Sequence, residues 1–322
     1  RPAVAATPPR PAAAATSTRQ TTTMSRPAAA RSTQFGILMM LGAAVTFGLQ
    51  DGLSRLLAEA YNVVSVITIR YWVFALFVLA FSASRPGGIR AVARSRRPWI
   101  QVFRSILLIT QISTAAYGFT VIGLVSWQVI FASYPLMIAA LSVPLLGERV
   151  GWRRWLAIMA GFAGVVLALD PGGDIFGYSM LLPLFGAAQF ALYGVMTRIA
   201  GRADSAETSF FWTGVVGVVT ISLVAPVAWN PPVGDDWWLM LILCVAGIGG
   251  HFLLIKAFEL AEAGVLQPFA YFGIATSAAV GYFGFGDAVT PAMLGGGAII
   301  IAAGLFTLWR EHVVARRGAK GS

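Results

Sequence analysis

Seven polar side chains lie within long apolar runs of the sequence and are the first candidates for chemistry. They are Gln50, Asp51, Arg70, Gln111, Gln189, His251 and Gln267. If these runs cross a membrane, water does not satisfy the polar groups, which must pair internally or line a wet cavity. Amides hold a substrate by hydrogen bonds, and a carboxylate or an imidazole can also carry a proton. The residue types therefore predict substrate binding and, for some of them, proton coupling.

The candidates for coupling or ion pairing are Asp51, Arg70 and His251. Asp51 could pair with Arg55, one helical turn later, or with Arg70 in the next run. A structural ion pair is our first interpretation, and proton titration or binding of a substrate ammonium group is the alternative. His251 has an ordinary pKa near 6.5, so it could change charge around neutral pH.

The remaining polar residues lie either near the middle of an apolar run or near its end. Gln111 and His251 stand 140 residues apart, near the middle of two runs that correspond in the repeat described below. We expect this pair to face a shared cavity; the alternative is a hydrogen bond from each to a neighbouring helix. Arg104 and Lys256 lie nearer to run ends, where long basic side chains are expected to reach headgroups or water.

Aromatic residues inside the runs form a second candidate set for substrate binding. It contains Trp127, Tyr134, Tyr193 and Tyr271. Two prolines, Pro135 and Pro268, lie close to members of this set. A proline within a helix lacks a donor and bends the helix, and such broken helices often border binding sites in transporters. We expect the two prolines to act in gating; plain packing of the aromatic rings is the alternative.

Motifs for enzymatic chemistry are missing from the sequence. There is no GxxxxGK[ST] loop, and the glycine runs lack the strand-to-helix context that binds phosphate. The single cysteine, Cys244, and two histidines form no pattern typical of a metal site or a nucleophilic triad. We therefore expect no enzyme, no metal and no cofactor. An intramembrane lipid-modifying enzyme is a distant alternative.

The elements that must position these groups are membrane-spanning helices. The chain is 57% apolar and only 11% charged, too few charges to cover a water-facing surface. Ten runs have about the length that crosses 30 Å of hydrocarbon as a helix. Their cores are Phe35 to Leu57, Val63 to Phe81, Phe103 to Val121, Val125 to Leu146, Trp155 to Leu169, Tyr178 to Ile199, Ser209 to Trp229, Trp237 to Leu260, Val265 to Phe285 and Pro291 to Trp309.

Basic residues lie on one side of these runs, which accounts for the net charge of +10. The loop after the second run contains Arg85, Arg90, Arg94, Arg96 and Arg97, and the loops on the other side contain mainly acids such as Asp174 and Asp235. Short loops rich in Lys and Arg stay in the cytoplasm. We therefore expect both termini to be cytoplasmic, and the charge gives no reason to predict nucleic-acid binding.

The second five runs resemble the first five at a shift of about 140 residues. Because five is odd, the second copy would enter the membrane from the opposite face, as in inverted-repeat transporters. We predict a disordered cytoplasmic tail over 1–34, a first repeat over 35–170, a second over 177–309 and a basic cytoplasmic tail over 310–322.

Three segments resemble the repeat of the drug/metabolite transporter superfamily, EamA-type. They are FASYPLMIAALSVPLLGERVGWRRWLAIMAGFAGVVLAL, which includes Pro135, Gly147-Glu148, Gly161 and Gly164, and the two openings GILMMLGAAVTFGLQDGLSR and GYSMLLPLFGAAQFALYGVMTR. The second copy has Asp287 where the first has Glu148. Among members, the chain looks most similar to bacterial aromatic amino-acid exporters of the YddG type.

The combined expectation is an all-α inner-membrane protein with ten transmembrane helices in two inverted five-helix repeats. The resemblance implies export of aromatic or other apolar amino acids by alternating access, with a small molecule and the lipid bilayer as partners. The alternatives are transport of a drug-like amine or a nucleotide sugar, or a passive channel. The oligomeric state is not predicted.

Overall fold

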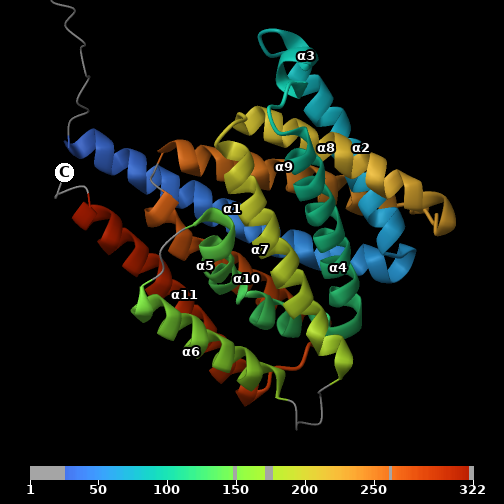
Figure 1. Cartoon of the computed structure of the whole chain (residues 1–322). Helices are drawn as coiled ribbons and strands as arrows, with labels where there is room; N and C mark the ends of the chain where they lie inside the picture. The colour runs from blue at the N-terminus through green and yellow to red at the C-terminus, as the bar shows by residue number, and fades with distance from the viewer. Residues whose placement is uncertain (1–25, 148–150, 171–176, 261–262, 319–322) are drawn as a thin grey trace, which may run out of the picture.

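The computed structural model describes residues 26–147, 151–170, 177–260 and 263–318, which form helices joined by loops, with no strand among them. The helices pack side by side in one bundle (Figure 1). They are α1 (Arg26–Tyr61), α2 (Val63–Ala83), α3 (Gly88–Ala93), α4 (Pro98–Phe131), α5 (Tyr134–Leu146), α6 (Trp152–Leu169), α7 (Leu182–Gly201), α8 (Ala206–Val224), α9 (Asp236–Leu260), α10 (Ala263–Phe285) and α11 (Pro291–Gly318), with short 3₁₀ turns η1 (Tyr178–Leu181) and η2 (Ala225–Val227). The all-α prediction is confirmed.

Eight helical segments in the described part of the chain are long and apolar enough to cross a membrane. They fall in α1, α2, α4, α6, α7, α8, α9 and α11; α5, with 13 residues, is a shorter apolar helix. Each of the ten predicted runs overlaps a helix, and the fourth is divided between α4 and α5. The chain is therefore a multi-pass helical membrane protein.

The outermost helices begin and end inside the predicted tails. Helix α1 begins at Arg26, within the segment 1–34 that was expected to be disordered, and α11 continues to Gly318, beyond Trp309. Both extensions contain Ala and Arg, which favour helix and let it continue past the apolar part. The predicted disorder of residues 1–25 lies outside the described residues.

Two breaks interrupt the helix in this region: one separates the predicted third and fourth spans, and the other divides the fourth. Gly123 has φ 81° and ψ 168°, which bends α4 sharply, and the helix then continues from Leu124 to Phe131. A turn at Ala132 and Ser133 ends α4, and Pro135 lies in the first turn of α5, where its missing N–H is not needed. The loop expected between the third and fourth runs is therefore a single glycine kink.

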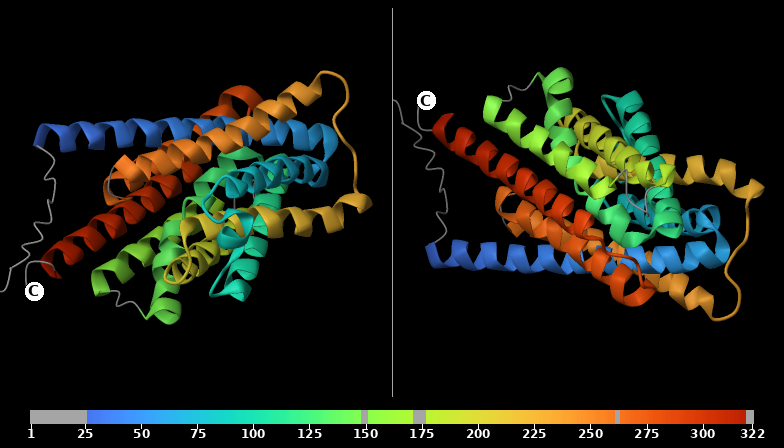
Figure 2. Two further views of the ribbon diagram at one scale, coloured as in Figure 1. Left: turned by 90° about the horizontal axis from the view of Figure 1, so that it is seen from above. Right: turned by 90° about the horizontal axis from the view of Figure 1, so that it is seen from below.

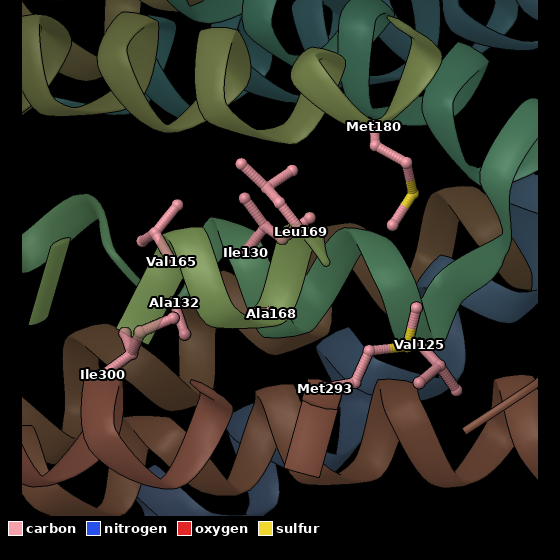
Figure 3. Close-up of a cluster of buried hydrophobic side chains, with 9 residues drawn as sticks. All are labelled: Val125, Ile130, Ala132, Val165, Ala168, Leu169, Met180, Met293 and Ile300. Carbon is pink, nitrogen blue, oxygen red and sulfur yellow. The ribbon is translucent and has the colours of Figure 1, made fainter. Parts of the chain in front are cut away.

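Helix packing follows a regular scheme. Helix α1 packs on α9 and α10, while α7 packs on α4 and α5; α2 contacts α8, and α6 contacts α11. The beginning of α1 and the end of α11 lie at the same end of the bundle in both views of Figure 2. A buried cluster joins α4, α6, η1 and α11 (Figure 3). It consists of Val125, Ile130, Ala132, Val165, Ala168, Leu169, Met180, Met293 and Ile300.

The α6–α11 contact depends on a close approach of the two backbones at Gly296. A Cβ there would lie 2.4 Å from the Gly164 carbonyl oxygen, whereas a Cβ on the adjacent Gly295 would meet only Leu167, at 3.5 Å. We expect Gly296→Ala to destabilise the protein by about 1–3 kcal/mol because two backbones must separate. Thermal unfolding in detergent checks this against Gly295→Ala. Equal melting temperatures for the two variants would contradict the packing described.

Candidate functional site

A cavity of about 500 Å³ lies between α2, α4, α7, α8 and α9. The residues that α4 contributes are Arg104, Leu108 and Ile112, and those from α7 are Tyr193, Thr197 and Gly201. Both sets repeat every four residues, so each presents one face of its helix to the cavity. The remaining wall is largely aromatic and apolar, with Tyr71, Phe74, Phe210, Leu243 and Ile248 among its residues. Such a lining suits a small amphipathic molecule.

Arg104 lies in the wall of this cavity and is almost completely buried, with 1% of its surface exposed. Its Nε donates to Gln101 Oε1 at 2.6 Å, and its Nη2 donates to the Ser209 carbonyl and to Thr213 Oγ1. The guanidinium also lies 5.8 Å from the centre of the Tyr193 ring. The prediction that Arg104 reaches headgroups or water is wrong, because polar groups of α8 hold it inside the bundle.

A hydrogen-bond network connects Arg104 to Asp204, in the loop between α7 and α8. Gln101 Nε2 donates to Asp204 Oδ2 at 2.9 Å, and the Arg96 N–H donates to Asp204 Oδ1 at 2.7 Å. Ser95 Oγ also donates to this carboxylate. Desolvation alone would raise the pKa of Asp204, but these hydrogen bonds outweigh it and lower the pKa below its ordinary value. Asp204 therefore stays ionised where the cavity meets the loop.

The depressed pKa gives a pH-dependent contribution to stability. Ionised Asp204 stabilises the fold above its unfolded pKa, near 3.9, and this contribution disappears as pH falls through the lower folded pKa. We expect Asp204→Asn to melt below wild type at pH 6, with a difference that shrinks below about pH 4. Melting curves from pH 6 to pH 3 measure it, with the exposed Asp235→Asn as control. A constant difference across this range would refute the assignment.

Arg70 lines the cavity from α2, one turn before Phe74, and lies near Cys244 and His251 of α9. Its Nη1 donates to Ser54 Oγ at 3.1 Å. No ion pair within the described segments involves Arg70, so the predicted pair with Asp51 does not form. A half-buried guanidinium thus faces the cavity with one protein hydrogen bond.

Asp51 has other partners. Gln128 Nε2 donates to Asp51 Oδ2 at 2.8 Å and to Ser277 Oγ at 2.9 Å. These three residues belong to α1, the second part of α4 and α10, so the carboxylate joins three helices. The predicted pair of Asp51 with Arg55 does not form either, because Arg55 is bound elsewhere.

Arg55 belongs to a network at the opposite end of the bundle from Asp204. It forms ion pairs with Glu59 at 2.8 Å and with Asp287 at 2.6 Å. The other oxygen of Asp287 accepts the N–H groups of Leu124 at 2.6 Å and Val125 at 3.2 Å. Asp287 thereby caps the helix that restarts after the Gly123 kink and fastens it to α1.

Two of the predicted binding residues, His251 and Tyr193, line the cavity. His251 is exposed there, and its Nδ1 lies 2.8 Å from the Gly247 carbonyl oxygen. Gln111 does not line the cavity and is 6% exposed, so the structure does not bring Gln111 and His251 to one surface. Leu108 and Ile112 occupy the lining positions of that part of α4.

The other predicted residues lie away from the cavity. Trp127 is 1% exposed and packs against Gly118 and Gly186, which makes it a core residue. Tyr134 packs edge-on against Phe190. The buried hydroxyl of Tyr271 has no hydrogen-bond partner and lies against Gly304.

Three glutamines and one proline complete the set. Gln50 is buried, and its Oε1 has no partner and lies beside Gly247. Gln189 donates to Thr110 Oγ1 at 3.3 Å. Pro268 lies within α10. The side chain of Gln267, and the loop with Glu148, lie outside the described residues.

Sequence reasoning misassigned Arg104 and missed the other polar groups at the loop end of the cavity. The missed groups are Gln101, Asp204, Ser209 and Thr213. One signal was present: Gln101, Arg104 and Leu108 share a helix face at three- and four-residue spacing. Their partner helix, α8, follows only from the tertiary packing.

In comparisons with known proteins, the chain is similar to transporters of small molecules. Residues 34–169 match the EamA-like transporter family. A relative named S-adenosylmethionine uptake transporter, from Rickettsia prowazekii, is 28% identical over 86% of this chain and 93% of its own length. A riboflavin transporter from Vibrio cholerae is 26% identical over 85% and 93%, and a pseudopaline exporter from Pseudomonas aeruginosa is 22% identical over 83% and 94%.

A solved structure described only as a crystal structure of protein has a similar fold. Its TM-score is 0.56 at 16% sequence identity, over 89% of this chain and 98% of that one. At this identity the likeness concerns the fold alone.

Proposed function

We propose that the chain is an EamA-type protein of the drug/metabolite transporter superfamily. It carries a small, partly aromatic metabolite across the bacterial inner membrane by alternating access. The observation that carries this proposal is the cavity of about 500 Å³ inside the bundle. Tyr71, Phe74, Tyr193 and Phe210 line it, and aromatic rings of this kind pack against a planar group. A transporter of small metabolites needs such a site between its helices.

We propose further that ten helices cross the membrane as two inverted repeats, α1, α2, α4, α5 and α6 followed by α7 to α11. The packing scheme supports this arrangement. The contacts of α1 with α9 and α10 correspond to those of α7 with α4 and α5, while α2–α8 and α6–α11 pair equivalent helices. The shared end of the two described termini (Figure 2) and the basic loops support cytoplasmic termini.

The cavity and the Arg55 network suggest the conformational state. The cavity reaches Asp204 in a loop that we place on the cytoplasmic side. At the other end, Asp287 ties α1 to the kink of α4, which closes that side. This is the inward-facing arrangement of an alternating-access cycle. Movement would require the Asp287 contacts to open, with a hinge at the 132–133 turn before Pro135 and bending at Pro268 as the gating motion.

Candidate substrates come from two sources. The sequence resemblance implies export of aromatic amino acids, and the names of the relatives add S-adenosylmethionine and riboflavin. All of these contain a planar ring. The relatives are named for uptake in one case and for export in another, so both directions belong in the assay.

Reconstitution into liposomes tests the proposal. We expect labelled tryptophan, S-adenosylmethionine or riboflavin to enter in a saturable way and to accumulate transiently against unlabelled compound inside. A passive channel would give no such counterflow, and an enzyme would form product in detergent without a sealed compartment. Parallel runs with and without a pH gradient measure coupling. Fluxes equal to those of protein-free liposomes for the whole panel would refute the proposed function.

A further inference from the structure

We infer that Arg70 binds a carboxylate group of the transported metabolite inside the cavity. The inference rests on the proposed function and names the chemistry of its substrate. It starts from position: Arg70 is seven residues from the start of α2, or about 10 Å along the helix, so it lies inside the apolar span. A charged side chain at such depth faces a partner or a wet path.

No acid in the described residues forms an ion pair with Arg70. Among these residues, the Arg70 guanidinium donates one hydrogen bond, to the Ser54 hydroxyl at 3.1 Å. Asp51 is close enough for its charge to act on Arg70, but its carboxylate is hydrogen-bonded to Gln128 and lies beyond ion-pair distance. An unpaired guanidinium is expensive to keep in a bundle interior. A bound anion would supply the missing charge together with acceptors for the remaining N–H groups.

The chemistry of the wall favours a carboxylate over a phosphate. Arg104, the other guanidinium of the wall, donates to Gln101, Ser209 and Thr213. Arg70 therefore offers most of the uncommitted charge, which matches a monoanion. A guanidinium fork also fits the two oxygens of a carboxylate, and Tyr71 and Phe74 on the same helix face leave apolar room for a ring.

The same wall disfavours a simple amine. The lining acid among the described residues is Asp204, whose oxygens accept from Ser95, Arg96 and Gln101 at the loop end. Apart from Asp204, no carboxylate in the described residues lines the cavity, so an amine without a carboxylate of its own would meet a like charge at Arg70. A drug-like amine is thus a poor occupant of this site.

Two matched compound pairs test the inference: tryptophan against tryptophanamide, and S-adenosylmethionine against its decarboxylated form. Binding to purified protein is measured by calorimetry, and transport by counterflow. We expect whichever carboxylate is transported to bind about 10- to 100-fold more tightly than its counterpart, the range for a charge-assisted hydrogen-bonded pair. In Arg70→Gln the affinity for the carboxylate should fall by the same factor, so that the two compounds of the pair become nearly equal.

Arg85→Gln is the matched control, because it removes an equal charge from an exposed ion pair with Glu207 outside the cavity. It should keep the full preference. Equal binding of both compounds by wild type, or an unchanged preference in Arg70→Gln, would overturn the inference while transport persists. If Arg70→Gln does not fold, the wild-type comparison and Arg70→Lys, which keeps the charge but loses the fork, decide the matter. Failure of every compound to be transported would instead refute the proposed function.

Discussion

Gly201→Trp is expected to reduce transport to the level of protein-free liposomes. Gly201 lines the cavity at its loop end, and a Cβ added there would meet no atom within 4 Å. An indole can therefore enter without displacing the helices, and it would obstruct the loop end of a cavity of about 500 Å³. The measurement is counterflow of whichever labelled compound wild type transports. The physical reason is exclusion of the substrate, so the loss should appear in both directions.

Gly249→Trp is the matched control for this blockade. A Cβ at Gly249 also meets no atom within 4 Å, but this residue does not line the cavity. It should retain most of the wild-type transport, and both variants should melt close to wild type. Wild-type rates in a folded Gly201→Trp would show that the transport path lies elsewhere.

Asp287→Ala is expected to give the largest loss of stability, about 3 kcal/mol. Asp287 has 9% side-chain exposure, and its loss leaves Arg55 without its more buried partner and two N–H groups of α4 without a cap. Asp287→Asn should lose less, because an amide oxygen can still accept from Leu124 and Val125. Thermal unfolding in detergent measures both.

Glu59→Ala tests whether the stabilisation comes from the helix cap and buried ion pair of Asp287 or from any acid beside Arg55. Glu59 contacts the same guanidinium but is 40% exposed, so its removal should cost less than about 1 kcal/mol. Similar melting temperatures for Glu59→Ala and Asp287→Ala would disprove the role given to Asp287.

The fold class could be predicted because hydropathy is a local property of the sequence. Each apolar run found by its length overlaps a helix, and the boundary predicted between Val121 and Val125 coincides with the kink at Gly123. Helix ends were harder. Arg26 and Gly318 lie in polar segments, where helix continues through propensity and not through the apolar length that marked the runs.

The candidate site could be predicted only in part, because a residue's depth does not say which way it points. His251 and Tyr193 line the cavity, whereas Gln111 and Trp127 are buried in packing. Arg104 was assigned to the membrane surface from its place in the run. Its partners Ser209 and Thr213 lie more than a hundred residues away in sequence, and no local pattern connects them to Arg104.

The central claim, that the transported metabolite binds in this cavity, is tested most directly by cysteine protection. His251→Cys in a Cys244→Ala background places one thiol at an exposed position of the cavity wall. Asp235→Cys in the same background places one at an exposed loop position that does not line the cavity. We predict that the transported compound slows reaction of a small polar thiol reagent at position 251 and not at 235. An unchanged rate at 251, in a preparation that performs counterflow, would contradict the account.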